Sequence, residues 1–256
     1  MLKYSAIILV VLMSACTVFM PSGSASAILR GVESYSDASG RSVILVPMVH
    51  YGKAHHYQKV GEYLAQKSSE GYAIFYEGVS FASREDMEHL DEIMGDSTLL
   101  NEYRKRCDTL YRKYRRVVGF FNSGGENQYS DTANLSLPRK YRRGDKVTQS
   151  NSLLGLDTLP KVYWVDMTYP EIVARYESEL QTITLTQYDW QTPLRAQYNP
   201  NDGVEYDRYK FLVEYRDEYI AQKALECDFN DVAIVYGREH LRGIAEALCE
   251  AGFSSR

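Results

Sequence analysis

The sequence has little of several features that would define its class at once. It contains only four cysteines, none of which form a Cys-x-x-Cys pair, and this spacing argues against zinc-ribbon chemistry. The formal net charge of -5 gives no reason to expect nucleic acid as a partner. No apolar run reaches the ~18–20 residues that a membrane-spanning helix needs. Zinc ribbons, nucleic-acid-binding proteins and spanning helices are therefore not expected.

The composition that is present is typical of a globular protein. Hydrophobic residues make up 45% of the chain and charged residues 25%, which are ordinary values. Tyrosine occurs 22 times, and we expect many of these rings to pack while their hydroxyls stay in water. We expect residues 1–27 to be an export signal and residues 28–256 to form a single domain.

The N-terminal segment has the pattern of an export signal. Lys3 supplies a positive charge, Ala6–Ala15 is almost wholly apolar, and small residues follow. Two processing sites compete: Met13–Cys16 resembles a bacterial lipobox and would leave Cys16 lipidated, whereas Ala25–Ala27 fits ordinary signal peptidase. We favour the lipobox, and so expect an exported protein, periplasmic or at the cell surface, anchored to the membrane by a lipid.

Two apolar runs each lead to a histidine. Residues 42–49 read as a strand and end at His50, and residues 232–236 read as a second strand, followed by His240. Each histidine alone is explained as a strand end that contacts a backbone carbonyl. Two in matching contexts favour a shared site, because ligands bind at the carboxyl edge of an open α/β sheet.

Glu77 follows a third apolar run, residues 72–76. A carboxylate at the tip of a buried strand is costly unless it is paired or bound to a cation, although a solvated strand end or a helix cap would also explain it. Together with His50 and His240 it forms a candidate site for a divalent metal. Two histidines and one carboxylate accept Zn, Mn, Fe or Co.

The remaining pattern predicts an α/β protein with a mostly parallel sheet flanked by helices, because strands alternate with helices along the chain. A helical and loop insertion interrupts it in the middle, and residues 122–154 read as a surface excursion. Residues 28–40 are expected to be a tether or edge segment. The expected strands are 42–49, 72–76, 161–166 and 232–236; the expected helices are 54–68, 83–121, 169–180, 204–227 and 241–250, with a loop over 182–202.

Several charged and histidine side chains are expected on solvated helix faces. The basic stretch 109–121 could bind an anion or a membrane surface, but an exposed face of an amphipathic helix is the simpler interpretation in an acidic chain. We also place His55, His56 and His89 on exposed faces.

The ordered motifs resemble those of the TraB/PrgY/GumN family, which includes the Tiki proteases and is related to the erythromycin-esterase and ChaN-like fold. The family carries two Gly-x-x-His motifs and an acid after a strand. The matching elements here are Pro47–His50, with Pro in place of Gly; Tyr76–Gly78; Val165–Met167, with Met in place of Arg; Tyr215–Asp217; and Gly237–His240.

This resemblance implies a metal-dependent, peptidase-like hydrolase acting on a peptide or a small molecule. His50 and His240 would be metal ligands, and Glu77 a third ligand or the base that acts on metal-bound water. Arg216 would hold a substrate carboxylate or stabilise an oxyanion, and Asp166 would orient a histidine.

Three alternatives stay open. ChaN-like relatives suggest a lipoprotein that binds haem or iron without turnover. The erythromycin-esterase relatives suggest hydrolysis without metal, with a histidine as general base. The departures Pro47 and Met167 suggest a degenerate member that acts as a scaffold.

Overall fold

The computed structural model describes residues 31–49, 51–119 and 146–256. The expectations for the export signal and Cys16, for His50, and for most of the 122–154 excursion fall outside these residues. The described chain divides into two compact units. The sheet unit comprises residues 31–77, 146–166 and 216–256 without the gap at 50, and the helical unit comprises residues 78–119 and 167–215.

The sheet unit contains a six-stranded sheet in the order β6-β4-β7-β2-β1-β8, which confirms an α/β fold with a mostly parallel sheet. The pairs β2/β7, β7/β4 and β4/β6 are parallel, whereas β1 is antiparallel to both β2 and β8. The strands are β1 (Glu33–Ser36), β2 (Ser42–Met48), β4 (Ala73–Tyr76), β6 (Val162–Trp164), β7 (Asp231–Gly237) and β8 (Ser254–Ser255). Residues 28–40, expected to be a tether or edge segment, include β1, which pairs with β2 on one side and with β8 on the other.

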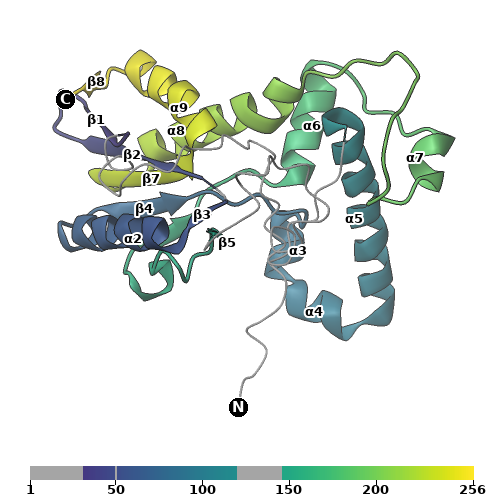
Figure 1. Ribbon diagram of the computed structural model, residues 1–256, viewed down its shortest axis with the longest axis horizontal. Coiled ribbons are helices and arrows are strands. Elements are labelled where there is room, and N and C mark those ends of the chain that lie inside the picture. Colours follow the sequence, from purple (N-terminus) through teal and green to yellow (C-terminus); the bar gives the residue numbers. More distant parts are fainter. Residues whose placement is uncertain (1–30, 50, 120–145) are drawn as a thin grey trace. The chain divides into compact units, whose positions relative to one another are not determined.

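Helices cover both faces of this sheet (Figure 1). All seven residues of β2 are buried, which suits a strand that is apolar on both faces. Alternate side chains of β2 and β7 pack against α8 (Tyr215–Glu226) and α9 (Arg238–Glu250) on one face, and against α2 (Ala54–Ser69) on the other. A separate two-stranded sheet pairs β3 (Tyr51–Lys53) with β5 (Lys146–Thr148), and a 3₁₀ turn spans Leu156–Thr158.

The helical unit contains shorter helices than the sequence pattern suggested. The predicted helix over 83–121 is three helices in its described part, because Asp96 caps a new helix by accepting hydrogen bonds from the backbone N–H groups of Thr98 and Leu99. Residues 182–202, expected to be a loop, include α7. The helices are α3 (Arg84–Glu88), α4 (Leu90–Gly95), α5 (Ser97–Val118), α6 (Tyr169–Glu179) and α7 (Gln187–Gln191), with a π-helical turn at Lys210–Glu214.

Aromatic rings form much of the interior of the helical unit. Phe81 stacks on Tyr169 with ring centroids 4.1 Å apart, and Tyr114 meets Tyr169 edge to face at 5.1 Å. Tyr114, Tyr169 and Tyr176 are almost fully buried. Burial of whole rings, rather than rings with wet hydroxyls, therefore explains part of the high tyrosine content.

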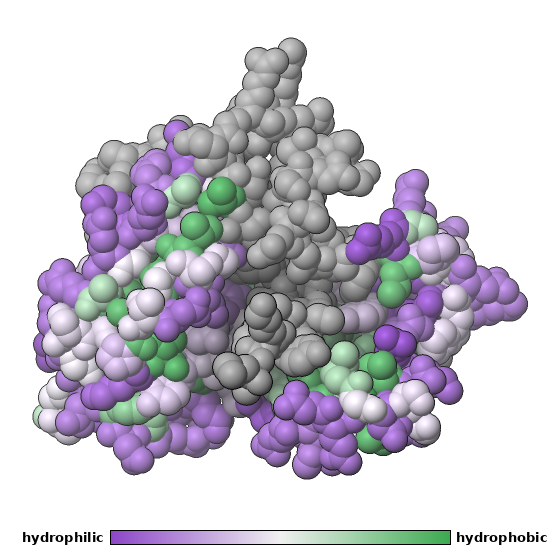
Figure 2. Space-filling view, turned by 90° about the horizontal axis from the view of Figure 1, so that it is seen from below, coloured by the Kyte–Doolittle hydropathy of each residue, from purple (hydrophilic) through white to green (hydrophobic). Residues whose placement is uncertain are grey.

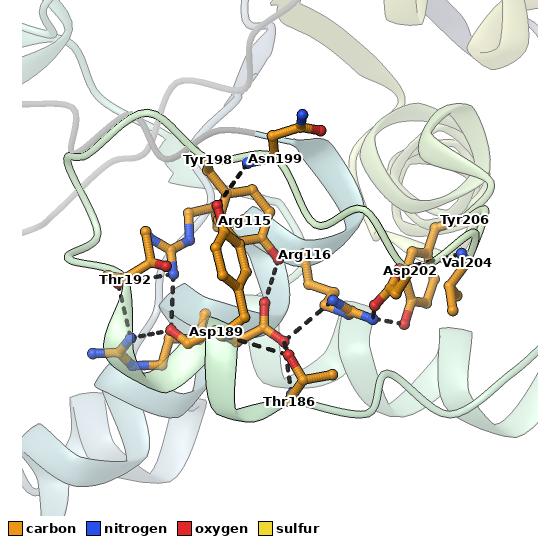
Figure 3. A network of polar contacts seen from close by, with 12 residues as sticks. Arg115, Arg116, Thr186, Asp189, Thr192, Tyr198, Asn199, Asp202, Val204 and Tyr206 are labelled. Carbon is orange, nitrogen blue, oxygen red and sulfur yellow. Dashed lines mark hydrogen bonds and ion pairs between the residues drawn. The ribbon is translucent and has the colours of Figure 1, made fainter.

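The basic end of α5 is buried, so the expectation of a solvated face is wrong for Arg115 and Arg116 (Figure 3). Arg115 donates to the backbone carbonyls of residues 189, 192 and 193, while Arg116 pairs with Asp189 and Asp202. Burial alone would raise the pKa of Asp189, but hydrogen bonds from Tyr198 and Thr186 lower this pKa below its ordinary value. The two arginines thus fix the chain that surrounds α7.

Two further expectations concern the membrane and the cysteines. Within the described residues, no helix is long and apolar enough to cross a membrane. Cys107, Cys227 and Cys249 are free thiols.

Candidate active site

Four of the residues singled out from the sequence, Glu77, Asp166, Arg216 and His240, meet at the carboxyl edge of the parallel sheet, all within the sheet unit. Glu77 follows β4 directly, and Asp166 comes two residues after β6. His240 is the third residue of α9, which follows β7, and Arg216 lies in the first turn of α8. Because parallel strands place their carboxyl ends at one edge, four separate segments deliver these side chains to one place.

Arg216 forms the centre of the cluster and is 1% exposed. Its Nε and Nη2 donate to the two carboxylate oxygens of Asp166 at 2.9 and 2.7 Å, which is a bidentate pair. Nη2 also donates to Oε1 of Glu77 at 2.7 Å, and Nη1 lies 3.1 Å from Nε2 of His240. The guanidinium therefore joins Asp166, Glu77 and His240.

His240 is held as a neutral imidazole of one tautomer. A guanidinium N–H can only donate, so Nε2 of His240 is the acceptor and Nδ1 carries the proton. Nδ1 then donates to Oδ1 of Asp217 at 2.6 Å. Burial, followed by the charge of Arg216, lowers the pKa of His240 to about 4. The imidazole is thus uncharged at neutral pH, which is the form that ligates a metal.

Glu77 is held by two different groups. Its Oε1 accepts from Arg216, while its Oε2 accepts from the backbone N–H of Gly237, 2.6 Å away, at the N-terminus of α9. This end of a helix favours a negative charge, so the carboxylate is stabilised there. Oε1 of Glu77 lies 3.6 Å from Nε2 of His240, with both side chains almost fully buried.

Tyr236 packs beside Arg216 in the cluster. Its hydroxyl donates to the carbonyl of Val165 at 2.6 Å, and the Arg216 guanidinium lies 5.9 Å from its ring centroid. Burial raises the pKa of this phenol well above its ordinary value, so it stays protonated and acts as a donor. It ties β7 to the segment that carries Asp166.

Gly243 permits the close approach between α9 and Asp217. A Cβ atom at this position would lie 2.2 Å from Oδ2 and 2.9 Å from Cγ of Asp217, which no real pair of atoms tolerates. Since Gly243 is three residues after His240, the two lie on the same side of α9. The glycine and the carboxylate together set the orientation of the imidazole.

The structure brings together Glu77, Asp166, Arg216 and His240, whereas His50 lies outside the described residues. Asp217 was missed as the group that orients His240, a task expected of Asp166. The sequence marked Asp217 only as part of the Tyr215–Asp217 element of the family resemblance and gave it no role. His240 itself lies within α9 rather than before it, because the helix begins at Arg238.

Of the three histidines placed on exposed faces, His55 and His89 are exposed but His56 is buried at 7% exposure. Burial, followed by the charge of His55, lowers the pKa of His56 to about 4. The expectation for His56 was therefore wrong, and this imidazole is also neutral at pH 7.

Metal ligation within the described residues rests on two donor atoms, Nε2 of His240 and Oε1 of Glu77. No group of three or more His, Cys, Asp or Glu side chains among residues 31–49, 51–119 and 146–256 is arranged to hold a metal ion. Comparisons with protein-family models, with curated proteins and with solved structures give no significant match.

Proposed function

We propose that the sheet-edge cluster of Glu77, Asp166, Arg216 and His240 is the active site of a divalent-metal-dependent hydrolase. His240 and Glu77 would be two of the metal ligands. One observation carries the proposal: a neutral imidazole Nε2 and a carboxylate oxygen lie 3.6 Å apart at the ends of adjacent parallel strands. The other imidazole nitrogen is held by the Asp217 carboxylate, as is common for histidines that bind metals.

The donor chemistry fits Zn, Mn, Fe or Co, and His50 is the proposed third ligand. Such a metal lowers the pKa of a bound water towards about 7 and so supplies hydroxide near neutral pH. The guanidinium of Arg216 contacts the same two donor atoms. If His240 and Glu77 were to hold a metal, Arg216 would have to release Nε2 of His240 and Oε1 of Glu77, and its bidentate pair with Asp166 would keep it nearby.

Each protein side chain then has a defined task. Asp217 keeps the proton on Nδ1 of His240, so that Nε2 carries the lone pair with which the imidazole would bind a metal. Asp166 anchors Arg216, which is placed to stabilise negative charge that develops beside Glu77. A peptide or small-molecule substrate follows from the family resemblance, as does the peptidase-like character.

Hydrolysis without metal is the second candidate, and the position of Arg216 favours it. In this version the guanidinium is the permanent cation of the site, bound to Nε2 at 3.1 Å and to Oε1 at 2.7 Å. The lowered pKa of His240 makes it a weak general base, so Glu77 would take the proton from water. The haem-binding and scaffold alternatives stay predictions that no contact described above favours.

A chelator experiment separates the two candidates. Peptide and ester substrates are screened with the full chain, with and without a chelator, and with Zn, Mn or Co added back. His240→Gln and Glu77→Gln are compared with His89→Gln, which changes an exposed histidine in the other unit.

Metal-dependent hydrolysis that is lost in the first two variants and kept in the third supports the metal mechanism. Chelator-resistant hydrolysis with the same pattern supports the metal-free candidate. Hydrolysis that survives in His240→Gln and Glu77→Gln contradicts both.

A further inference from the structure

A pocket of about 890 Å³ lies in the helical unit, among α3, α4, α5 and α6, and we call it the α3–α6 pocket. Its size falls within the range of small-molecule and cofactor sites, ~300–1,000 Å³. Its floor is apolar, formed by Ile93, Leu99, Leu110, Pro170, Val173 and Ala174. Its charged lining comprises Glu85, Asp86, Glu92 and Glu177, against Arg106 alone.

Ion pairs hold the walls of this pocket in place. Asp86 accepts from the backbone N–H of Ser83 in a capping box and pairs with Arg106. Glu177 accepts from Lys113 at 2.8 and 2.9 Å. The one guanidinium and these two carboxylates are therefore already committed to wall contacts.

The charge that remains at the rim is negative. Glu85 and Glu92 are exposed, and neither pairs with a lysine or arginine among the residues that the structure describes. Glu92 instead lies 3.7 Å from Nδ1 of His89. Figure 2 shows hydrophilic residues over much of the described surface on one face of the molecule, with hydrophobic residues gathered between them.

We propose that the α3–α6 pocket binds a cationic amphipathic peptide segment, in which an apolar side chain enters the pocket next to a lysine or arginine. The apolar floor accepts the side chain and gains from its removal from water. Glu85 and Glu92 then attract the neighbouring cation. An anionic ligand is disfavoured, because the single guanidinium of the lining already pairs with Asp86.

This binding site does not depend on the hydrolase proposal, since it uses none of the residues at the sheet edge. The test can therefore fail while the hydrolase proposal stands, and the reverse also holds.

The experiment measures binding of two fluorescent heptapeptides to the full chain by anisotropy, one alternating Leu and Lys and the other alternating Leu and Glu. Ala174→Trp fills the pocket from an exposed position on α6. Glu85→Lys with Glu92→Lys reverses the charge of the rim. Glu102→Lys is the matched control, since it changes an exposed carboxylate of α5 that does not line the pocket.

We expect the Leu–Lys peptide to bind and the Leu–Glu peptide not to bind. Ala174→Trp and the double charge reversal should each weaken binding by about tenfold or more, equal to about 1.4 kcal/mol, while Glu102→Lys stays close to wild type. Far-ultraviolet circular dichroism checks that the variants are folded. Failure of the Leu–Lys peptide to bind, equal binding of both peptides, or binding that Ala174→Trp leaves unchanged would overturn the proposal.

Discussion

Arg115 in the helical unit and Arg216 in the sheet unit are both buried, but their partners differ. In the helical unit, Arg115 donates to three backbone carbonyls and stacks on Tyr198, with its guanidinium 4.2 Å from the ring centroid (Figure 3). In the sheet unit, Arg216 contacts the side chains of Glu77, Asp166 and His240. Carbonyl acceptors fix the path of the chain, whereas carboxylate and imidazole acceptors are groups that bind cations and move protons.

This difference is why we propose the sheet-edge cluster, rather than the cluster around α7, as the candidate site. Buried titratable groups with a strongly shifted pKa occur in structural networks as well as in active sites, so burial alone does not decide. The sheet-edge cluster adds a fixed tautomer of His240 and a location at the carboxyl edge of the sheet. We therefore expect changes at Arg216 to alter both stability and chemistry, and changes at Arg115 to alter stability alone.

The largest effect is expected from Arg216→Met. The change leaves Glu77 and Asp166 as buried carboxylates without this partner, and breaking a buried pair costs about 3–5 kcal/mol. Chemical denaturation of the wild type and the variant measures the loss. A free energy of unfolding within about 1 kcal/mol of wild type would show that Arg216 does not hold the cluster together.

The pH dependence of stability is expected to come next in size. His240 has an ordinary pKa of 6.5 in the unfolded chain and about 4 in the folded protein. Between these two pKa values the unfolded chain binds a proton that the folded protein does not. The free energy of unfolding therefore has its full value above pH 6.5 and decreases as the pH is lowered towards 4, by up to about 3 kcal/mol.

Unfolding curves from pH 4 to pH 7 test this effect in the wild type and in His240→Gln. The variant should lose the part of the slope that comes from His240, while His56, whose pKa is also lowered to about 4, keeps its part. His89→Gln should keep the whole slope. Equal slopes in the wild type and His240→Gln would contradict the neutral, buried imidazole.

Gly243→Ala should cost about 1–3 kcal/mol, the usual range for overpacking, because its Cβ would collide with the carboxylate of Asp217. Movement of Asp217 should also weaken the hydrogen bond that Nδ1 of His240 donates, which proton NMR detects as a shift of the Nδ1–H resonance, while Arg216 keeps Nε2 as the acceptor. Gly95→Ala is the control, since a Cβ there meets nothing within 4 Å. An unchanged Nδ1–H resonance in Gly243→Ala would remove Asp217 from its orienting role.

The smallest effect is expected from Arg115→Met, at a cost of about 0.5–1.5 kcal/mol, because each carbonyl that loses Arg115 keeps another donor. Arg112 also donates to the carbonyls of residues 189 and 192, and the N–H of Ala196 donates to that of residue 193. Metal content and any hydrolysis should match wild type, measured on the same samples as Arg216→Met. Loss of either in folded Arg115→Met would remove the distinction between the two arginine clusters.

The sequence pattern predicted the architecture and part of the site because both depend on local features. Continuous apolar runs identified β2, β4 and β7, and the residues that follow them, Glu77 and His240, reached the sheet edge as expected. Asp217 and Gly243 could not be assigned in this way, because their contact joins two helices that are distant in sequence.

The errors have a related physical cause. Arg115, Arg116 and His56 were placed in solvent since charged and polar residues are usually exposed. Tertiary partners overrode that tendency for the two arginines: the carbonyls around α7 accept from Arg115, and Asp189 pairs with Arg116. Helix breaks within 83–118 depended on a local cap at Asp96, which the apolar spacing does not reveal.

The most direct test of the central claim is elemental analysis of the purified chain after exposure to Zn, Mn or Co. The account predicts near-stoichiometric metal in the wild type and in Arg115→Met. It predicts loss of that metal in His50→Ala combined with His240→Ala, and in Glu77→Gln. A wild type that binds none of these metals, or a double variant that binds as much as wild type, would contradict a metal site at the sheet edge.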